Sequence, residues 1–124
     1  MLILNRQSSD TSFVNKPSMN KRRSDRNHLI YKIENVSTGD FYIGVTVVTG
    51  RAYLKSLQSR WKRHIYKAMV LREEWLFPKA IREYGESQFK PEIIEIVRGK
   101  SIAFGRESQI INEIRPTYNT RMKC

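Results

Sequence analysis

The segments LIYKI (29–33) and FYIGV (41–45) decide the fold of this chain. Both are short runs rich in β-branched and aromatic residues, which are typical of a pleated, half-buried strand. Between them lies ENVSTGD (34–40), whose Asn, Ser, Gly and Asp residues favour turns. The pattern predicts a β-hairpin with one tyrosine on each strand. Because an isolated hairpin is only marginally stable, we expect it to pack against the helices that follow.

Two helices are predicted after the hairpin. Residues 46–53 show no helical period and predict a loop; the alternative for 46–48 is a continuation of the second strand. From 54 to 71 the apolar residues recur at helical spacing and form one stripe, which consists of Leu54, Leu57, Trp61, Ile65, Ala68 and Met69. Pro78 suits the first turn of a second helix, which we expect to end near Tyr84 with Gly85 as its stop.

A third strand and a third helix complete the predicted domain. Residues 89–97 have the composition of a strand, and Pro91 near its start indicates an edge strand or a strand beginning. Ser101 is the expected cap of a helix over 102–114, whereas residues 115–121 show no regular pattern. The predicted order is β-β-α-α-β-α, which makes this an α/β chain of the α+β type.

The composition indicates one basic domain. The chain has 124 residues, and 23 Lys and Arg against 12 Asp and Glu give a formal charge of +11. Such a charge attracts polyanions, and nucleic acid is the first candidate; the alternative is a generic basic protein. One Cys and two His exclude a disulfide within the chain. They also exclude a structural zinc site held by one chain, which needs about four ligands.

Two parts of the chain concentrate positive charge. Residues 1–27 hold six basic and two acidic residues, Arg22 and Arg23 among them, and predict a flexible arm that binds phosphates without reading sequence; the alternative is a solvated terminus. Between Asp40 and Glu73 there are seven Lys or Arg and no acid. Because like charges repel along the first predicted helix, a polyanionic partner would relieve that cost; the alternative is a solvated basic face.

One acidic residue falls on an apolar stripe. In the third predicted helix, Glu107 shares a face with Ala103, Ile110, Ile111 and Ile114. Burying an unpaired carboxylate is costly. Glu107 therefore either has a partner, such as an arginine, a hydroxyl cluster or a metal ion, or lies at the edge of the stripe and reaches water.

No segment resembles a membrane span. No run approaches the roughly 18 apolar residues that a spanning helix requires, and the apolar run that opens the chain is too short for the core of a signal peptide. We therefore expect no membrane partner, and we expect the protein to stay inside the cell that makes it.

Several of these residues together resemble the GIY-YIG nuclease family. The family is named for two motifs on adjacent strands, which stand here as LIY (29–31) and YIG (42–44), with eleven positions from tyrosine to tyrosine. The other matches are a catalytic arginine, the histidine four residues after it, a metal-binding glutamate and an asparagine near the end of the domain: Arg60, His64, Glu107 and Asn119.

The resemblance covers about 28–121 and implies a compact α+β domain with a three-stranded, mainly antiparallel sheet flanked by helices. The arm of residues 1–27 would precede this domain, and 122–124 would be a short tail. Leu29 replaces the glycine of the first motif, and the connection over 45–59 looks longer than in compact members. No appended DNA-reading domain is visible.

The resemblance implies hydrolysis of phosphodiester bonds in DNA with one divalent ion, Mg²⁺ or alternatively Mn²⁺, and with no small-molecule cofactor. Arg60 would stabilise charge on the phosphate, and Glu107 would hold the metal. Tyr31 is the first candidate for positioning or deprotonating the attacking water, with His64 second. An ordinary tyrosine pKa is about 10, so nearby cations would have to favour the phenolate. Tyr42 would orient water or phosphate.

The remaining expected roles are structural or concern DNA binding. Asn119 would hold the geometry of the metal site or contact phosphate, and Gly44 would allow close approach of the backbone where a side chain would clash. The residues expected to contact DNA are Lys62, Arg63, Lys67, Arg22 and Arg23.

Two other functions stay open at this point: a basic nucleic-acid-binding module without catalysis, and a nuclease that cuts RNA. Within the nuclease interpretation, the family contains homing, restriction, repair and phage-encoded enzymes, so the expected location is the cytoplasm of a bacterial or phage-infected cell. Cutting both strands of DNA would need a dimer or two visits, and the oligomeric state is left open.

Overall fold

Strand β1 (Asn27–Asn35) is the centre of the sheet in the computed structural model, which describes residues 25–119. It pairs antiparallel with β2 (Phe41–Val47) on one side and with β3 (Phe89–Arg98) on the other. The predicted hairpin is therefore confirmed, and the register places Tyr31 opposite Gly44. β3 is an edge strand, the position in which a strand tolerates Pro91.

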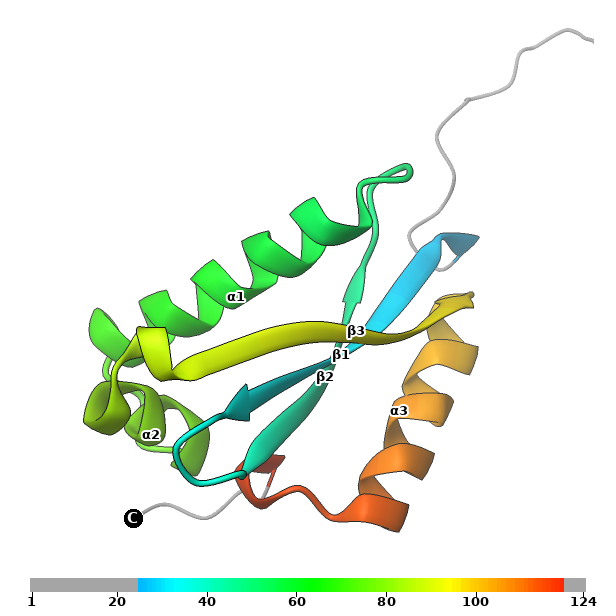
Figure 1. The fold of residues 1–124 in the computed structure, drawn as a ribbon. Helices are drawn as coiled ribbons and strands as arrows, with labels where there is room; N and C mark the ends of the chain where they lie inside the picture. Colours follow the sequence, from blue (N-terminus) through cyan, green and yellow to red (C-terminus); the bar gives the residue numbers. More distant parts are fainter. Residues whose placement is uncertain (1–24, 120–124) are drawn as a thin grey trace, which may run out of the picture.

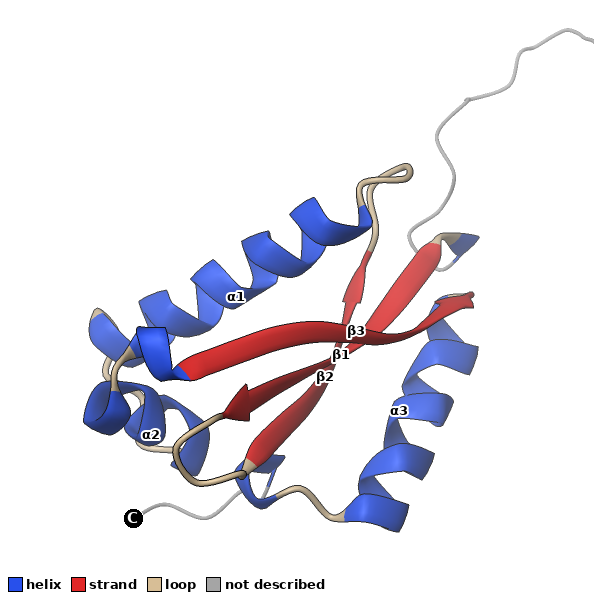
Figure 2. Ribbon diagram, in the orientation of Figure 1, coloured by secondary structure: helices blue, strands red, loops and turns tan. Residues whose placement is uncertain are grey.

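The helices cover both faces of this sheet (Figures 1 and 2). Helices α1 (Tyr53–Met69) and α2 (Leu76–Tyr84) pack on one face, and α3 (Lys100–Ile114) packs on the other. Two short 3₁₀ turns, η3 (Glu86–Gln88) and η4 (Thr117–Asn119), complete the elements of the described part of the chain. The predicted order β-β-α-α-β-α is confirmed.

Alternation along β1 creates two apolar cores. Leu29, Tyr31 and Ile33 point toward α1 and α2, whereas Ile30 points with Ile43 of β2 toward α3. This is the period of two that side chains follow along a strand. Because both faces of β1 are covered, apolar side chains occur at successive positions, as in 29–31.

The expectation of a long connection over 45–59 is wrong. β2 continues to Val47 and α1 begins at Tyr53, so residues 48–52 alone link them. The apolar stripe of α1 is also shifted: Leu57 and Ala68 are buried as predicted, but Leu54 is 67% exposed, and His64 takes a place among the buried residues. The face of a helix that is buried depends on where the sheet lies, and a polar residue with a partner can occupy it.

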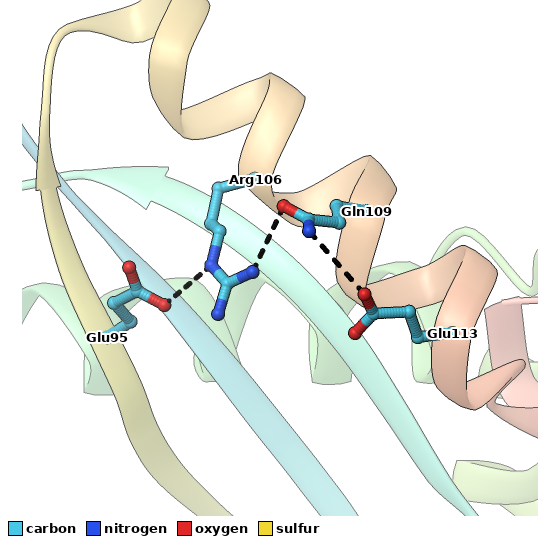
Figure 3. Close-up of polar contacts among 4 residues, drawn as sticks. All are labelled: Glu95, Arg106, Gln109 and Glu113. Atoms are coloured by element: carbon cyan, nitrogen blue, oxygen red, sulfur yellow. Dashed lines mark hydrogen bonds and ion pairs between the residues drawn. The ribbon is translucent and has the colours of Figure 1, made fainter.

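Helix α3 is attached to β3 by a chain of polar contacts (Figure 3). Arg106 Nε donates to Glu95 Oε1 over 2.9 Å, Arg106 Nη1 donates to Gln109 Oε1, and Gln109 in turn donates to Glu113. These groups are partly exposed, so we expect them to orient the helix more than to stabilise the fold. The helix begins at Lys100 after Gly99, so the expected cap at Ser101 is wrong.

The predicted arm and tail fall largely beyond this part of the chain. Arg22 and Arg23 lie outside the described residues, as does the tail of 122–124. Within residues 25–119, no helix combines the length and the apolar content that a bilayer-crossing helix needs.

Candidate active site

Three side chains from β1 and α1 meet at one hydroxyl group. The fully buried Tyr31 places its oxygen 2.8 Å from Nε2 of His64 and 3.4 Å from Nε of Arg60. Arg60 and His64 lie one turn apart on α1 and therefore face the same way. Since a guanidinium group only donates hydrogen bonds, the Tyr31 oxygen accepts from Arg60 and offers its own proton to His64. A neutral His64 then carries its proton on Nδ1.

Burial keeps both partners of this hydrogen bond neutral. Desolvation, together with the charges of Arg60 and Lys67, lowers the pKa of His64 to about 3. Burial also raises the pKa of the Tyr31 phenol, Tyr42 adds to that rise, and Arg60 offsets part of it. Arg60 alone therefore does not favour the Tyr31 phenolate that water activation was expected to require, because desolvation outweighs its charge.

The buried histidine predicts a loss of stability in mild acid. The pKa of His64 is about 3 in the folded chain and 6.5 in its ordinary state, so the folded state binds fewer protons between these values. The stability that depends on neutral His64 is therefore complete above pH 6.5 and is lost as the pH falls toward 3, at up to about 1.4 kcal/mol per pH unit. Urea unfolding of the wild type and of His64→Gln over this range measures it. The variant should show the shallower decline, and equal pH dependence would contradict the prediction.

Gly44 makes room for the tyrosine on the neighbouring strand. A Cβ atom built on Gly44 would overlap the Tyr31 hydroxyl and ring, and it would lie 2.8 Å from Cε2 of Tyr42. The two tyrosine rings, whose centroids are 6.2 Å apart, can converge because the residue opposite Tyr31 has no side chain. The glycine is thus required by a close approach of side chains to the backbone.

Gly44→Ala is expected to destabilise the fold by about 1–3 kcal/mol, the typical cost of overpacking a buried site. Gly105→Ala is the matched control: Gly105 lies in the exposed part of α3, and no heavy atom lies within 4 Å of an added Cβ. That change should stabilise the protein by about 0.5–1 kcal/mol through helix propensity. Denaturant unfolding of both proteins measures the contrast, and equal midpoints would refute the assigned role of Gly44.

Tyr42 is held by aromatic packing. Its ring stacks on Phe77 of α2, with centroids 4.5 Å apart and an interplanar angle of 4°. The edge-to-face contact with His64 has a centroid distance of 5.1 Å. Phe77 was not predicted as a partner of Tyr42, because the contact joins segments that are far apart in the chain. Tyr42 is half-buried, and its orientation is fixed from two sides.

A pocket of about 390 Å³ opens beside this cluster. Residues from α1, β2, α3, the segment before α2 and the C-terminal turn line it; the polar and charged ones are Tyr42, His64, Lys67, Glu73, Glu107, Tyr118 and Asn119, together with Trp75. β2 is an edge strand. Side chains from α1 and α3, which pack on opposite faces of the sheet, therefore reach one pocket.

Glu107 is the carboxylate that α3 contributes to the pocket. It is half-buried, and within residues 25–119 no ion pair or hydrogen bond engages it. Burial raises the pKa of Glu107, and the positive charge of Arg60 opposes part of that rise. Because the side chain is only partly buried, the structure is consistent with the alternative of an edge position that reaches water. Glu107 occupies the cavity wall with its ligand positions open.

Asn119 acts as a clamp on strand β2. Its Oδ1 accepts from the Ile43 amide and its Nδ2 donates to the Ile43 carbonyl, both over 2.8 Å. The expectation of an irregular tail is wrong here, because η4 buries Tyr118, whose hydroxyl accepts from Asn35. A single 3₁₀ turn has too few residues to show a period in the sequence. Both polar atoms of the Asn119 amide are in use, so Asn119 fits the role of holding the site's geometry.

The predicted DNA-contacting residues of α1 separate in the structure. Lys67 lines the pocket, whereas Arg63 lines a different cavity together with Arg60, and Lys62 is exposed. Glu73 lines the pocket but was not among the predicted site residues. As the first acid after the long basic stretch, it carried a signal of its own in the charge pattern.

The donor set fits a metal bound through one protein carboxylate. Among residues 25–119, no three His, Cys, Asp or Glu side chains gather to hold a metal ion. Mg²⁺ commonly takes one or two carboxylates and completes its shell with water and phosphate oxygens. The half-buried, unpaired carboxylate of Glu107 meets that requirement, and substrate would have to supply further ligands.

Comparison with known proteins identifies solved structures that share this fold. No family model matches the chain, and the search of curated proteins finds no relative. Among solved structures, a mutant of the catalytic domain of the intron endonuclease I-TevI matches with a TM-score of 0.57 at 22% identity, over 72% of this chain and 84% of that one. The catalytic domain of the homing endonuclease I-TevI matches with a TM-score of 0.54 at 22% identity, over 71% and 88%. The resemblance drawn from the sequence is thus confirmed at the level of architecture, and the chain has the GIY-YIG fold.

Proposed function

We propose that this protein is a metal-dependent endonuclease that hydrolyses phosphodiester bonds in DNA inside the cell that makes it. One observation carries the proposal: Arg60, Tyr31 and His64 form a hydrogen-bonded cluster next to a pocket whose wall holds the unpaired carboxylate of Glu107. The formal charge of +11 suits a polyanionic substrate. The shared fold with an endonuclease catalytic domain supports the same class of reaction.

Arg60 is the cation of the cluster and would face the negative charge that develops on the phosphate during the reaction. Attack on a phosphodiester builds negative charge on its non-bridging oxygens. Arg60 offers a permanently charged, planar group to those oxygens. It makes only one hydrogen bond, at 3.4 Å, within the described part of the chain, so its other donors are available to a phosphate.

Tyr31 and His64 are linked as a path for a proton. If the Tyr31 oxygen takes a proton from the attacking water, it can pass its own to Nε2 of His64, which is neutral and accepts. Tyr31 is fully buried and Arg60 lies against its hydroxyl. A phosphate that draws Arg60 toward itself would open the hydroxyl to water. The pair therefore needs no free phenolate in the resting protein.

Glu107 would hold the divalent ion, Mg²⁺ or alternatively Mn²⁺, together with water and phosphate. When bound, such an ion supplies Lewis-acid stabilisation of the leaving 3′ oxygen. Asn119 keeps β2 in place through the Ile43 backbone, which fixes the neighbouring Tyr42 in the pocket wall.

A nicking assay tests the function. Supercoiled plasmid incubated with the protein should become nicked or linear with Mg²⁺ or Mn²⁺ and stay intact with EDTA. A labelled RNA, run as a separate arm, tests the RNA-directed alternative. A clean gel shift without cutting in any metal would refute catalysis and leave the binding-module alternative.

A further inference from the structure

A second cavity lies beside the candidate active site. It has a volume of about 480 Å³ and runs between the end of β2 and the first half of α1. The residues that matter in its lining are Thr46 of β2 and Lys55, Ser56, Ser59, Arg60 and Arg63 of α1. We call this cavity the basic groove.

The groove is lined by donors and contains no acid. Three cations, Lys55, Arg60 and Arg63, line it, and no carboxylate does. Within residues 25–119, no ion pair or side-chain hydrogen bond engages Lys55 or Arg63. The hydroxyl groups of the lining add further donors. A groove with several free cations and hydroxyl groups suits a chain of phosphates, which offers acceptors and negative charge in series.

The groove continues from the active site. Along β2, the side chains of Tyr42 and Thr46 and the Gly44 position lie on one face, because alternate residues of a strand point the same way. Tyr42 lines the catalytic pocket, Gly44 lies opposite Tyr31, and Thr46 lines the groove. Four residues of strand cover about 13 Å. Arg60 joins the two regions, since it lines the groove and also donates to Tyr31.

We propose that the basic groove binds the phosphodiester backbone of the nucleic acid strand immediately beside the phosphate that Arg60 faces. The inference rests on the proposed function and makes it more specific, because it gives the bound strand a direction: from the Glu107 pocket, past Gly44, toward Lys55. Contacts of this kind hold and orient the strand without reading its sequence.

Salt-dependent binding tests the groove. Anisotropy of a short labelled duplex is measured in EDTA, so that nothing is cut, over a series of salt concentrations. Lys55→Ala/Arg63→Ala is compared with Lys79→Ala/Lys90→Ala, which removes the same charge from exposed positions outside the groove and the pocket. Each lost phosphate contact reduces the magnitude of the negative slope of log K against log salt by about 0.9. The magnitude should therefore fall by about 1.8 in the groove variant and keep its wild-type value in the control. Circular dichroism confirms that both variants fold.

The outcomes separate the groove from the catalytic function. Equal slopes for the two double variants would overturn the groove, even if the wild type cuts plasmid in Mg²⁺. A selective loss of slope in the groove variant supports the groove, even if the wild type never cuts, in which case the proposed nuclease function fails alone. A wild-type protein that does not bind the duplex would overturn both.

Discussion

Glu107→Ala is expected to abolish cleavage of plasmid DNA while leaving the protein folded and able to bind DNA. Glu107 is the α3 carboxylate in the pocket wall, and it is unpaired within residues 25–119. In the proposed mechanism, removing it takes away the protein's ligand for the metal, so the leaving oxygen would lose its stabilisation. The residues proposed to bind phosphate lie on other elements and would be unaffected.

The experiment compares nicking and gel shift for the same protein preparations. Glu113→Ala is the matched control, because Glu113 lies on the same helix, is exposed and is outside the pocket. It should cut at the wild-type rate. Retained nicking by Glu107→Ala would remove Glu107 from the metal site, whereas loss of binding as well as cutting would point to a folding defect.

Glu107→Gln separates a catalytic role of the carboxylate from a purely structural one. Since burial raises the pKa of Glu107, the charged form is disfavoured in the folded protein. The neutral amide should therefore be at least as stable as the wild type at neutral pH while failing to cut. A stable, inactive Glu107→Gln protein would assign the carboxylate to chemistry.

Arg60→Ala is expected to slow the cleavage step by 10²–10³-fold, about 3–4 kcal/mol of lost transition-state stabilisation. The guanidinium group is positioned by α1 over the Tyr31 hydroxyl and has donors left for the phosphate. Single-turnover rates at saturating protein separate this effect from weaker binding, since Arg60 also lines the basic groove.

Arg60→Lys and Lys79→Ala complete this series. Lysine keeps the charge but not the planar fork, so it should recover part of the rate. Lys79 is exposed on α2 and lies outside both the pocket and the groove; its replacement should leave the rate unchanged. A wild-type rate for Arg60→Ala at saturation would contradict the role. Arg60→Ala should also raise the pKa of His64, because the charge of Arg60 helps to lower it.

Much of the fold was predictable from local patterns. The β-branched and aromatic residues of 29–33 and 41–45, with turn residues between them, predicted the hairpin, and the helical stripe predicted α1, because strands, turns and helices each favour particular residue types or periods. The spacing of Arg60 and His64 by one turn already placed them on one face. Glu107 could be identified as a candidate residue because a carboxylate on an apolar stripe carries an energetic cost.

Other features depended on contacts between distant segments. Phe77 stacks on Tyr42, and Asn119 clamps Ile43 across 76 positions of sequence. Glu73 reaches the same pocket from the segment before α2. No local period reports such contacts, because they form only when segments far apart in the sequence pack together.

The sequence by itself determined which elements form and which side chains could carry the chemistry, since both follow from the order and spacing of residue types. The tertiary structure alone decided the protonation states of the side chains Tyr31 and His64. From the sequence, a Tyr31 phenolate would need nearby cations to favour it; in the fold, burial raises the pKa of Tyr31 and is the main cause that lowers that of His64 to about 3. The physical reason is that desolvation depends on what surrounds a group in three dimensions, and here it outweighs the charge of a neighbour on the helix.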